Sequence, residues 1–194
     1  MTRSKDSTML AVGLDFDGTV ADTNTLKAHW IKEHLGISIE PHLCDWTNCV
    51  PIIGQDAYRE MANDVFGREA AAIVRPIPGA LDVIRRLRAV REVVIVTART
   101  GERMEIASDW LSAHEATRGM RVIGVNTREV SKVQRCLEEE IGALVEDDER
   151  HLYDARSQGV EAVLFRMDGP EDLRCDYADL CRSWDEIGRV LGVG

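Results

Sequence analysis

The sequence Asp15-Phe16-Asp17-Gly18-Thr19 follows directly on the apolar run Met9–Leu14. A short apolar run that ends in a glycine-containing turn is typical of a buried β-strand. In an extended chain Asp15 and Asp17 point to the same side, so their charges repel unless a cation lies between them. A plain Asp-Gly loop turn is the structural alternative. We interpret this stretch as the end of a first strand and the centre of a functional site.

Further apolar runs of strand length follow along the chain, bounded by turn residues. They are Val93–Val96, Arg121–Val125, Ala143–Val145 and Ala162–Phe165. Helical patterns separate these runs, which is typical of buried parallel strands. The sequence therefore predicts an α/β fold with a Rossmann-like, three-layer core around a central parallel sheet.

The predicted helices between these runs carry apolar residues on one face. The apolar positions are Leu81, Ile84 and Leu87, then Met104, Ala107 and Leu111, then Val133, Leu137 and Ile141. Ser131 and Gln134 form a potential capping box for the last of these helices. Another helix is expected to begin near Glu149 and to end at Gly159.

Residues 21–77 interrupt this alternation. Their aromatic residues lie in helical contexts, and they are Trp30, Trp46, Tyr58 and Phe66. Simple βα connections are much shorter, so the segment predicts a helical insert after the first strand. We predict a core domain of residues 1–20 and 78–194 and an insert of residues 21–77. A core helix followed by a long loop is the alternative.

Two more polar groups are expected beside the first motif. Thr97 follows the run Val93–Val96, and its hydroxyl could donate to a phosphate oxygen, with Arg99 adding a charged fork. Lys132 follows the predicted N-cap Ser131, where the helix N-terminus is already partly positive. A cation is disfavoured there, which indicates another task, such as holding a carboxylate and a phosphate together; a solvated surface lysine is the alternative.

The acidic run Glu146-Asp147-Asp148 follows the predicted strand Ala143–Val145. Buried acids at a strand end require a cation or solvent. All strands of a parallel sheet with right-handed crossovers end on one edge, where ligands bind. The acidic run, the first motif, Thr97 and Lys132 should therefore converge there. A hard divalent cation such as Mg²⁺ suits paired carboxylates and can bridge them to a phosphate.

The order of these motifs resembles the haloacid dehalogenase (HAD) superfamily of phosphohydrolases. The resemblance covers nearly the whole chain and makes the insert of residues 21–77 a small α-helical cap. It implies that Asp15 is the nucleophile and Asp17 the general acid/base. It also implies that Thr97 and Lys132 bind the phosphate and the charge that develops on it.

The resemblance further implies a Mg²⁺ site of Asp15, the carbonyl group of Asp17 and Asp147, with Asp148 beside it. Substrate contacts are expected from the neighbours of two motifs, namely Gly18, Thr19, Ala98 and Arg99. In this superfamily phosphatases and phosphomutases carry an acid at the position of Asp17, whereas dehalogenases lack it.

These features predict a Mg²⁺-dependent phosphomonoester hydrolase that acts on a small phosphorylated metabolite through an aspartyl-phosphate. The segments Ile95–Arg99 and Ser183–Ile187 resemble the 5′(3′)-deoxyribonucleotidase-like branch, which favours a nucleoside monophosphate. The alternatives are a sugar-phosphate or other metabolite phosphatase, then a phosphomutase. A regulatory binding protein that kept the fold and lost the chemistry is the alternative outside the enzymes.

Composition narrows the partners and the compartment. The net charge of −10 disfavours nucleic-acid polymers and anionic membranes, and no apolar run is long enough to span a bilayer. Five scattered cysteines predict a reducing cytoplasm rather than a disulfide framework. His42, Cys44 and Cys49 could form part of an alternative metal site, for zinc. No second pair of ligands with the usual spacing accompanies them. The sequence carries no signal for an oligomeric state.

Overall fold

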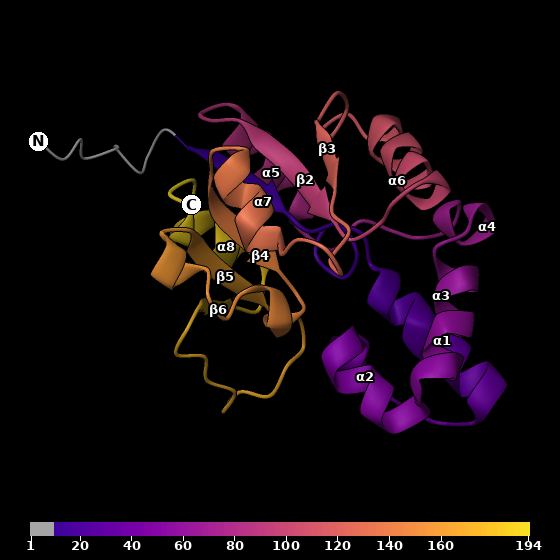
Figure 1. The fold of residues 1–194 in the computed structure, drawn as a ribbon. Helices are drawn as coiled ribbons and strands as arrows, with labels where there is room; N and C mark the ends of the chain where they lie inside the picture. The colour runs from indigo at the N-terminus through magenta and orange to yellow at the C-terminus, as the bar shows by residue number, and fades with distance from the viewer. Residues whose placement is uncertain (1–9) are drawn as a thin grey trace, which may run out of the picture.

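The computed structural model describes residues 10–194, in which a central parallel sheet has helices on both faces (Figure 1). Within these residues the sheet has six strands in the order β3-β2-β1-β4-β5-β6. The strands are β1 (Ala11–Leu14), β2 (Val93–Thr97), β3 (Val122–Gly124), β4 (Ile141–Glu146), β5 (Glu161–Phe165) and β6 (Asp179–Cys181). All five pairings are parallel, which confirms the predicted α/β fold. Met9, at the start of the first predicted run, lies outside the described residues.

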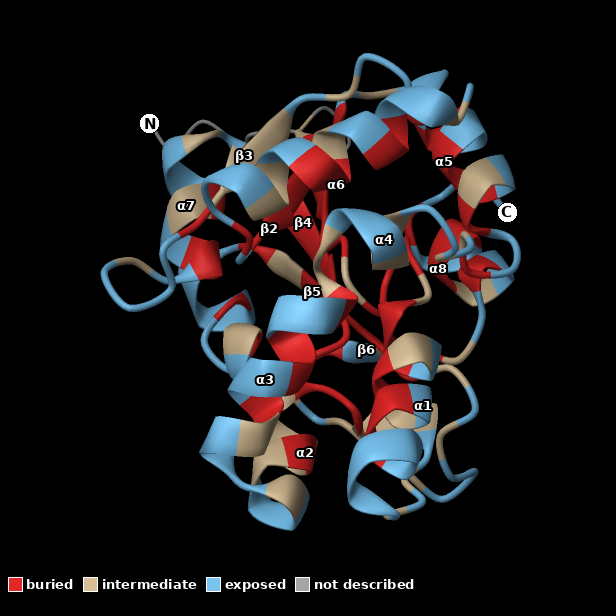
Figure 2. Cartoon of the chain, turned by 90° about the vertical axis from the view of Figure 1, so that its right-hand side faces the viewer, coloured by how far each residue is buried: buried red, intermediate tan, exposed pale blue. Residues whose placement is uncertain are grey.

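Two apolar layers enclose the sheet. One face is covered by α5 (Ala80–Arg88), α6 (Glu102–Ala113) and α8 (Trp184–Val190). The other is covered by α7 (Lys132–Glu138) and the segment 149–160. Figure 2 shows the buried strands between helices whose outer sides are exposed. Apolar spacing on one side of each helix produces this arrangement because only that side can be buried against the sheet.

Three local expectations were wrong or incomplete. Ile141 does not continue the helix of Val133, because α7 ends at Glu138 and Ile141 begins β4. The segment from Glu149 to Gly159 forms two 3₁₀ helices, η3 (Glu149–His151) and η4 (Arg156–Gln158), instead of one α-helix. Strand β6 was not predicted, since it is only three residues long and its first residue is exposed.

The insert is helical, as expected, and packs around an apolar cluster of its own. It contains α1 (Thr23–Leu35), η2 (Pro41–Leu43), α2 (Trp46–Ile53), α3 (Gln55–Val65) and α4 (Arg68–Ala71). Trp30, Ile31 and Met61 are buried in its cluster. Asp22 and Asp45 start α1 and α2 by accepting backbone N–H groups from inside each helix. The division of the chain into a core domain and a cap stays a prediction.

Trp184 joins the C-terminal helix to the loop after β1. Its side chain is fully buried, and its indole Nε1 donates to the carbonyl oxygen of Thr19 at 2.9 Å. The same ring lies beside Phe165 of β5, with ring centroids 6.4 Å apart. Helix α8 therefore supports the loop that carries the first motif.

We expect Trp184→Phe to lower the free energy of unfolding by about 1–3 kcal/mol, because it leaves the buried Thr19 carbonyl without this donor. Urea unfolding followed by circular dichroism measures the change. Val190→Ala, at an exposed position of the same helix, should change the value by less than about 0.5 kcal/mol. Equal effects of the two substitutions would contradict the anchoring role of Trp184.

Candidate active site

The loop after β1 brings the first and last motifs into contact. Gly18 has a φ of +78°, and a Cβ at this position would lie 2.1 Å from Asp147 Oδ2. Only glycine leaves room for the Asp147 carboxylate there. The Gly18 amide donates to the carbonyl of Ala21 at 2.9 Å, so it shapes the loop itself. Thr19 is fully buried beneath the loop.

Lys132 is the cation at the centre of the site. It is the first residue of α7, whose N-cap Ser131 accepts the amide of Gln134 at 3.0 Å. The buried ammonium donates to Asp15 and, at 2.6 Å, to Glu146 Oε2. Burial lowers the pKa of Lys132, but the two carboxylates outweigh burial and raise it above its usual value. Lys132 therefore stays charged and links β1, β4 and α7.

Asp15, Glu146 and Asp147 form a buried acidic cluster, with oxygens within 4.8 Å of one another. Burial is the largest cause that raises their pKa values, to about 7 for Asp15 and Asp147 and about 8 for Glu146. Repulsion between the carboxylates adds to this shift. Three acids that face the single ammonium of Lys132 fit a hard divalent cation such as Mg²⁺. Within residues 10–194 no other set of His, Cys, Asp or Glu side chains forms such a cluster. His42, Cys44 and Cys49, the alternative zinc ligands, do not form one either.

The other acids predicted to serve the metal have different partners. Asp148 accepts from Thr47 Oγ1 of α2 at 2.8 Å and pairs with Arg150 at 2.8 Å. Asp17 is held by Arg99, whose Nε and Nη2 donate to its two oxygens at 2.8 and 2.7 Å. The structure thus places the Asp17 and Asp148 carboxylates beside the cluster and Glu146 within it.

Arg99 is packed as well as paired. Its guanidinium lies 5.0 Å from the centroid of the Phe16 ring and 4.5 Å from that of Phe66. Burial raises the pKa of Asp17, but the Arg99 charge and its hydrogen bonds outweigh burial and hold that pKa below its ordinary value. Asp17 is therefore a stable carboxylate in this arrangement. The two guanidinium donors of Arg99, expected to bind a phosphate, bind the carboxylate of Asp17 in this structure.

Thr97 and Ala98 follow β2 at the same edge of the sheet. Thr97 is buried, and its hydroxyl oxygen accepts the amide of Arg99 at 3.1 Å. Ala98 lines the pocket above the sheet edge, whereas Thr97 does not. Their roles toward a substrate stay predictions.

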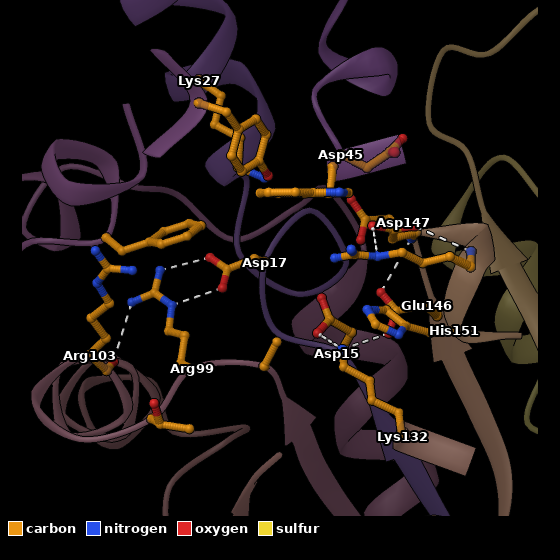
Figure 3. Close-up of a pocket in the computed structure, with 17 residues that line it drawn as sticks. Asp15, Asp17, Lys27, Asp45, Arg99, Arg103, Lys132, Glu146, Asp147 and His151 are labelled. Carbon is orange, nitrogen blue, oxygen red and sulfur yellow. Dashed lines mark hydrogen bonds and ion pairs between the residues drawn. The ribbon is translucent and has the colours of Figure 1, made fainter. Parts of the chain in front are cut away.

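A pocket of about 200 Å³ lies between the sheet edge and the insert (Figure 3). The core side contributes Asp15, Asp17, Arg99, Lys132 and the acidic run, and the insert contributes Lys27, Trp46, Tyr58 and Phe66. Trp30 does not line the pocket; its indole donates to Asp64 at 2.8 Å within the insert. His151 lines the pocket, and burial lowers its pKa to about 2, which keeps the imidazole neutral.

The sequence did not single out three of these pocket residues, namely Arg103, Arg150 and His151, nor Asn24, which contacts the acidic cluster. Asn24 joins the insert to the acidic cluster, because its Nδ2 donates to Asp147 Oδ2 at 2.8 Å. No sequence pattern indicates such contacts between distant segments. Lys27 had one available signal: it is one of only four lysines in the chain.

No protein-family model and no curated protein sequence matches the chain, whereas many solved structures do. A HAD-family hydrolase from Deinococcus radiodurans, solved with bound phosphate and sodium, has 15% sequence identity and a TM-score of 0.66 over 97% of this chain and 98% of that one. A predicted phosphoglycolate phosphatase from Haemophilus somnus has 14% identity and a TM-score of 0.64 over 94% and 98%. The L-2-haloacid dehalogenase of Xanthobacter autotrophicus has 13% identity and a TM-score of 0.63 over 95% and 98%.

These likenesses cover the sheet, its helices and the insert together. The chain therefore has the fold of the HAD-family hydrolases, as its motifs predicted.

In residues 10–194 no helix combines the length and the apolar character needed to cross a bilayer.

The raised pKa values predict how pH acts on the protein without divalent cations. The three acids of the cluster have folded-state pKa values of about 7 to 8, above their usual values near 4. Folding therefore takes up protons between about pH 4 and pH 8, so stability falls as pH rises through this window. We expect the Tm in EDTA to fall from pH 5 to pH 8, and Mg²⁺ to raise it more at pH 8.

Differential scanning fluorimetry measures these values with and without Mg²⁺. Asp147→Asn should weaken both effects, while the exposed Asp109→Asn should preserve them. A wild-type Tm that does not respond to Mg²⁺ at either pH would contradict a metal site in this cluster.

Proposed function

We propose that the protein is a phosphomonoesterase of the HAD superfamily that hydrolyses a small phosphorylated metabolite through an aspartyl-phosphate on Asp15. The observation that carries the proposal is the buried contact between Asp15 and Lys132 at the floor of the pocket. It supplies a carboxylate nucleophile and a fixed positive charge at one point.

The acidic cluster supports a Mg²⁺ requirement. Asp15, Glu146 and Asp147 would hold the ion. When bound, Mg²⁺ supplies positive charge that lets an anionic phosphate approach these carboxylates. Part of the charge repulsion that raises their pKa values is then relieved.

In the first half-reaction a carboxylate oxygen of Asp15 attacks phosphorus, and the bond from phosphorus to the ester oxygen breaks. Lys132 holds Asp15 in place and stabilises the charge on the phosphoryl oxygens. In the second half-reaction water attacks the phosphorus of the aspartyl-phosphate. Inorganic phosphate leaves, and Asp15 is regenerated.

Asp17 serves as the proton carrier of this scheme. As the carboxylate paired with Arg99, it is ready to take the proton of the attacking water. To protonate a leaving alkoxide it must first bind a proton, which requires Arg99 to withdraw. An acid at this position favours a phosphatase over a dehalogenase.

The pocket favours a compact substrate. Its volume of about 200 Å³ lies below the range of about 300–1,000 Å³ common for ligand pockets. A small sugar phosphate or acid phosphate suits it better than a nucleoside monophosphate, although Trp46, Tyr58 and Phe66 offer ring faces for a base.

The five free cysteines support the expected cytoplasmic location.

Asp15→Asn should reduce turnover by at least about 10³-fold, because it removes the nucleophile. Mg²⁺-dependent phosphate release from an aryl phosphate and a sugar phosphate measures the loss. Asp109→Asn makes the same chemical change on an exposed surface and should keep wild-type rates. Turnover by purified Asp15→Asn protein would refute the mechanism.

Asp17→Asn should impair alkyl phosphates more than aryl phosphates, because an aryl leaving group needs little protonation. It should also slow hydrolysis of the aspartyl-phosphate, so that an initial burst of the aryl alcohol precedes slow steady-state release. Rapid-mixing kinetics resolves the burst. An equal loss on both ester types, without a burst, would exclude Asp17 as the proton carrier.

A further inference from the structure

Lys27 is a buried cation on the insert side of the pocket. It belongs to α1 and lies across the pocket from Asp15 and Lys132 (Figure 3). The residue is only 3% exposed, and its ammonium donates to Asn24 Oδ1 at 2.8 Å. An ammonium has three N–H donors, so this contact leaves two for another partner.

Apart from Asp147, the other buried acids and Lys132 of the site have partners of opposite sign. The pairs are Asp17 with Arg99, Asp148 with Arg150, Asp45 with Arg166, and Lys132 with both Asp15 and Glu146. Among residues 10–194 Lys27 takes part in no such ion pair. Burial lowers the pKa of Lys27, but Tyr58, Asp147 and Asp17 raise it above its usual value, so the group is charged.

A second cation extends this positive region. Arg103 lies 5.6 Å from the centroid of the Phe66 ring, and the Lys27 ammonium lies 5.6 Å from the same centroid. Arg103 donates to Asn63 of α3, and within the described part of the chain it forms no ion pair. Lys27 and Arg103 thus flank Phe66 with two charges that form no ion pair within residues 10–194, in a chain whose net charge is −10.

The two remaining N–H donors of the Lys27 ammonium and the guanidinium of Arg103 can bind an anionic group that enters the pocket. We propose that the substrate carries a second acidic group, a carboxylate or a further phosphate, and that Lys27 binds it with Arg103 beside it. The inference rests on the proposed phosphomonoesterase activity and names its substrate class. A compact phosphorylated acid or bisphosphate fits the small pocket between the acidic cluster and this positive region.

The competing role for Lys27 is structural. Lys27 bonds to Asn24, which bonds to Asp147, so the lysine could act only by positioning the acidic cluster. In that case every phosphomonoester would lose turnover by the same factor when Lys27 is changed. Binding of a second acidic group instead changes the selectivity between substrates, mainly through KM.

Matched substrates separate the two roles. Glycerol 3-phosphate and 3-phosphoglycerate differ by a carboxylate, and fructose 6-phosphate and fructose 1,6-bisphosphate differ by a phosphate. We expect the wild type to prefer the more acidic member of at least one pair by about tenfold or more in kcat/KM. The pair that shows the preference identifies the acidic group.

Lys27→Met should reduce that preference by about tenfold, through KM, while Lys27→Arg restores part of it. Lys32→Met changes an exposed lysine of the same helix and should leave the ratio unchanged. Thermal melts verify that the variants are folded. The substrate preference of the wild type tests the inference even if a variant does not fold. Equal wild-type rates within both pairs, or an equal loss on both members in Lys27→Met, would overturn the inference. No Mg²⁺-dependent turnover of any phosphomonoester would overturn the proposed function itself.

Discussion

The balance between one buried ammonium and three buried carboxylates is the constraint on which this site depends. A parallel sheet brings the ends of β1 and β4 to one edge, and with them Asp15, Glu146 and Asp147. Lys132 enters from α7 and contacts two of the three acids. Burial and the remaining negative charge keep their pKa values high, so a bound cation would stabilise this site.

The insert is attached to this same acidic edge. Asn24 contacts Asp147, Thr47 contacts Asp148, and Asp45 forms a buried ion pair with Arg166 at 3.1 Å. Arg166 also donates to the carbonyl of Asp147. The helices that close the pocket are therefore positioned by contacts with Asp147 of the acidic cluster and with its neighbours, so pocket shape and cluster geometry depend on each other.

The sequence predicted the parts of this structure that local patterns specify. The strands of the core follow from short apolar runs, and Lys132 followed from its unfavourable place in the first turn of a helix. The pairing of Asp17 with Arg99 could not be predicted, because it joins residues 82 positions apart. Glu146 was left without a role for the same reason, since its contact with Lys132 exists only once β4 and α7 pack together. The segment 149–159 lacks the continuous apolar face that would have held it as one α-helix. Strand β6 is too short to show an alternation of apolar and polar residues.

Asp17 lies between the two charged regions of the pocket, and its ionisation depends on both domains of the predicted architecture. Arg99 comes from the end of β2 and neutralises Asp17, while Phe66 of the insert packs against the outer face of Arg99. A displacement of Phe66 would expose the guanidinium to water and weaken its hold on the carboxylate. The pKa of Asp17 would then rise toward its ordinary value, and the group could carry a proton more readily. The position of the insert and the protonation of Asp17, the proposed proton carrier, are in this way physically coupled, although Asp17 and Phe66 lie 49 positions apart in the chain.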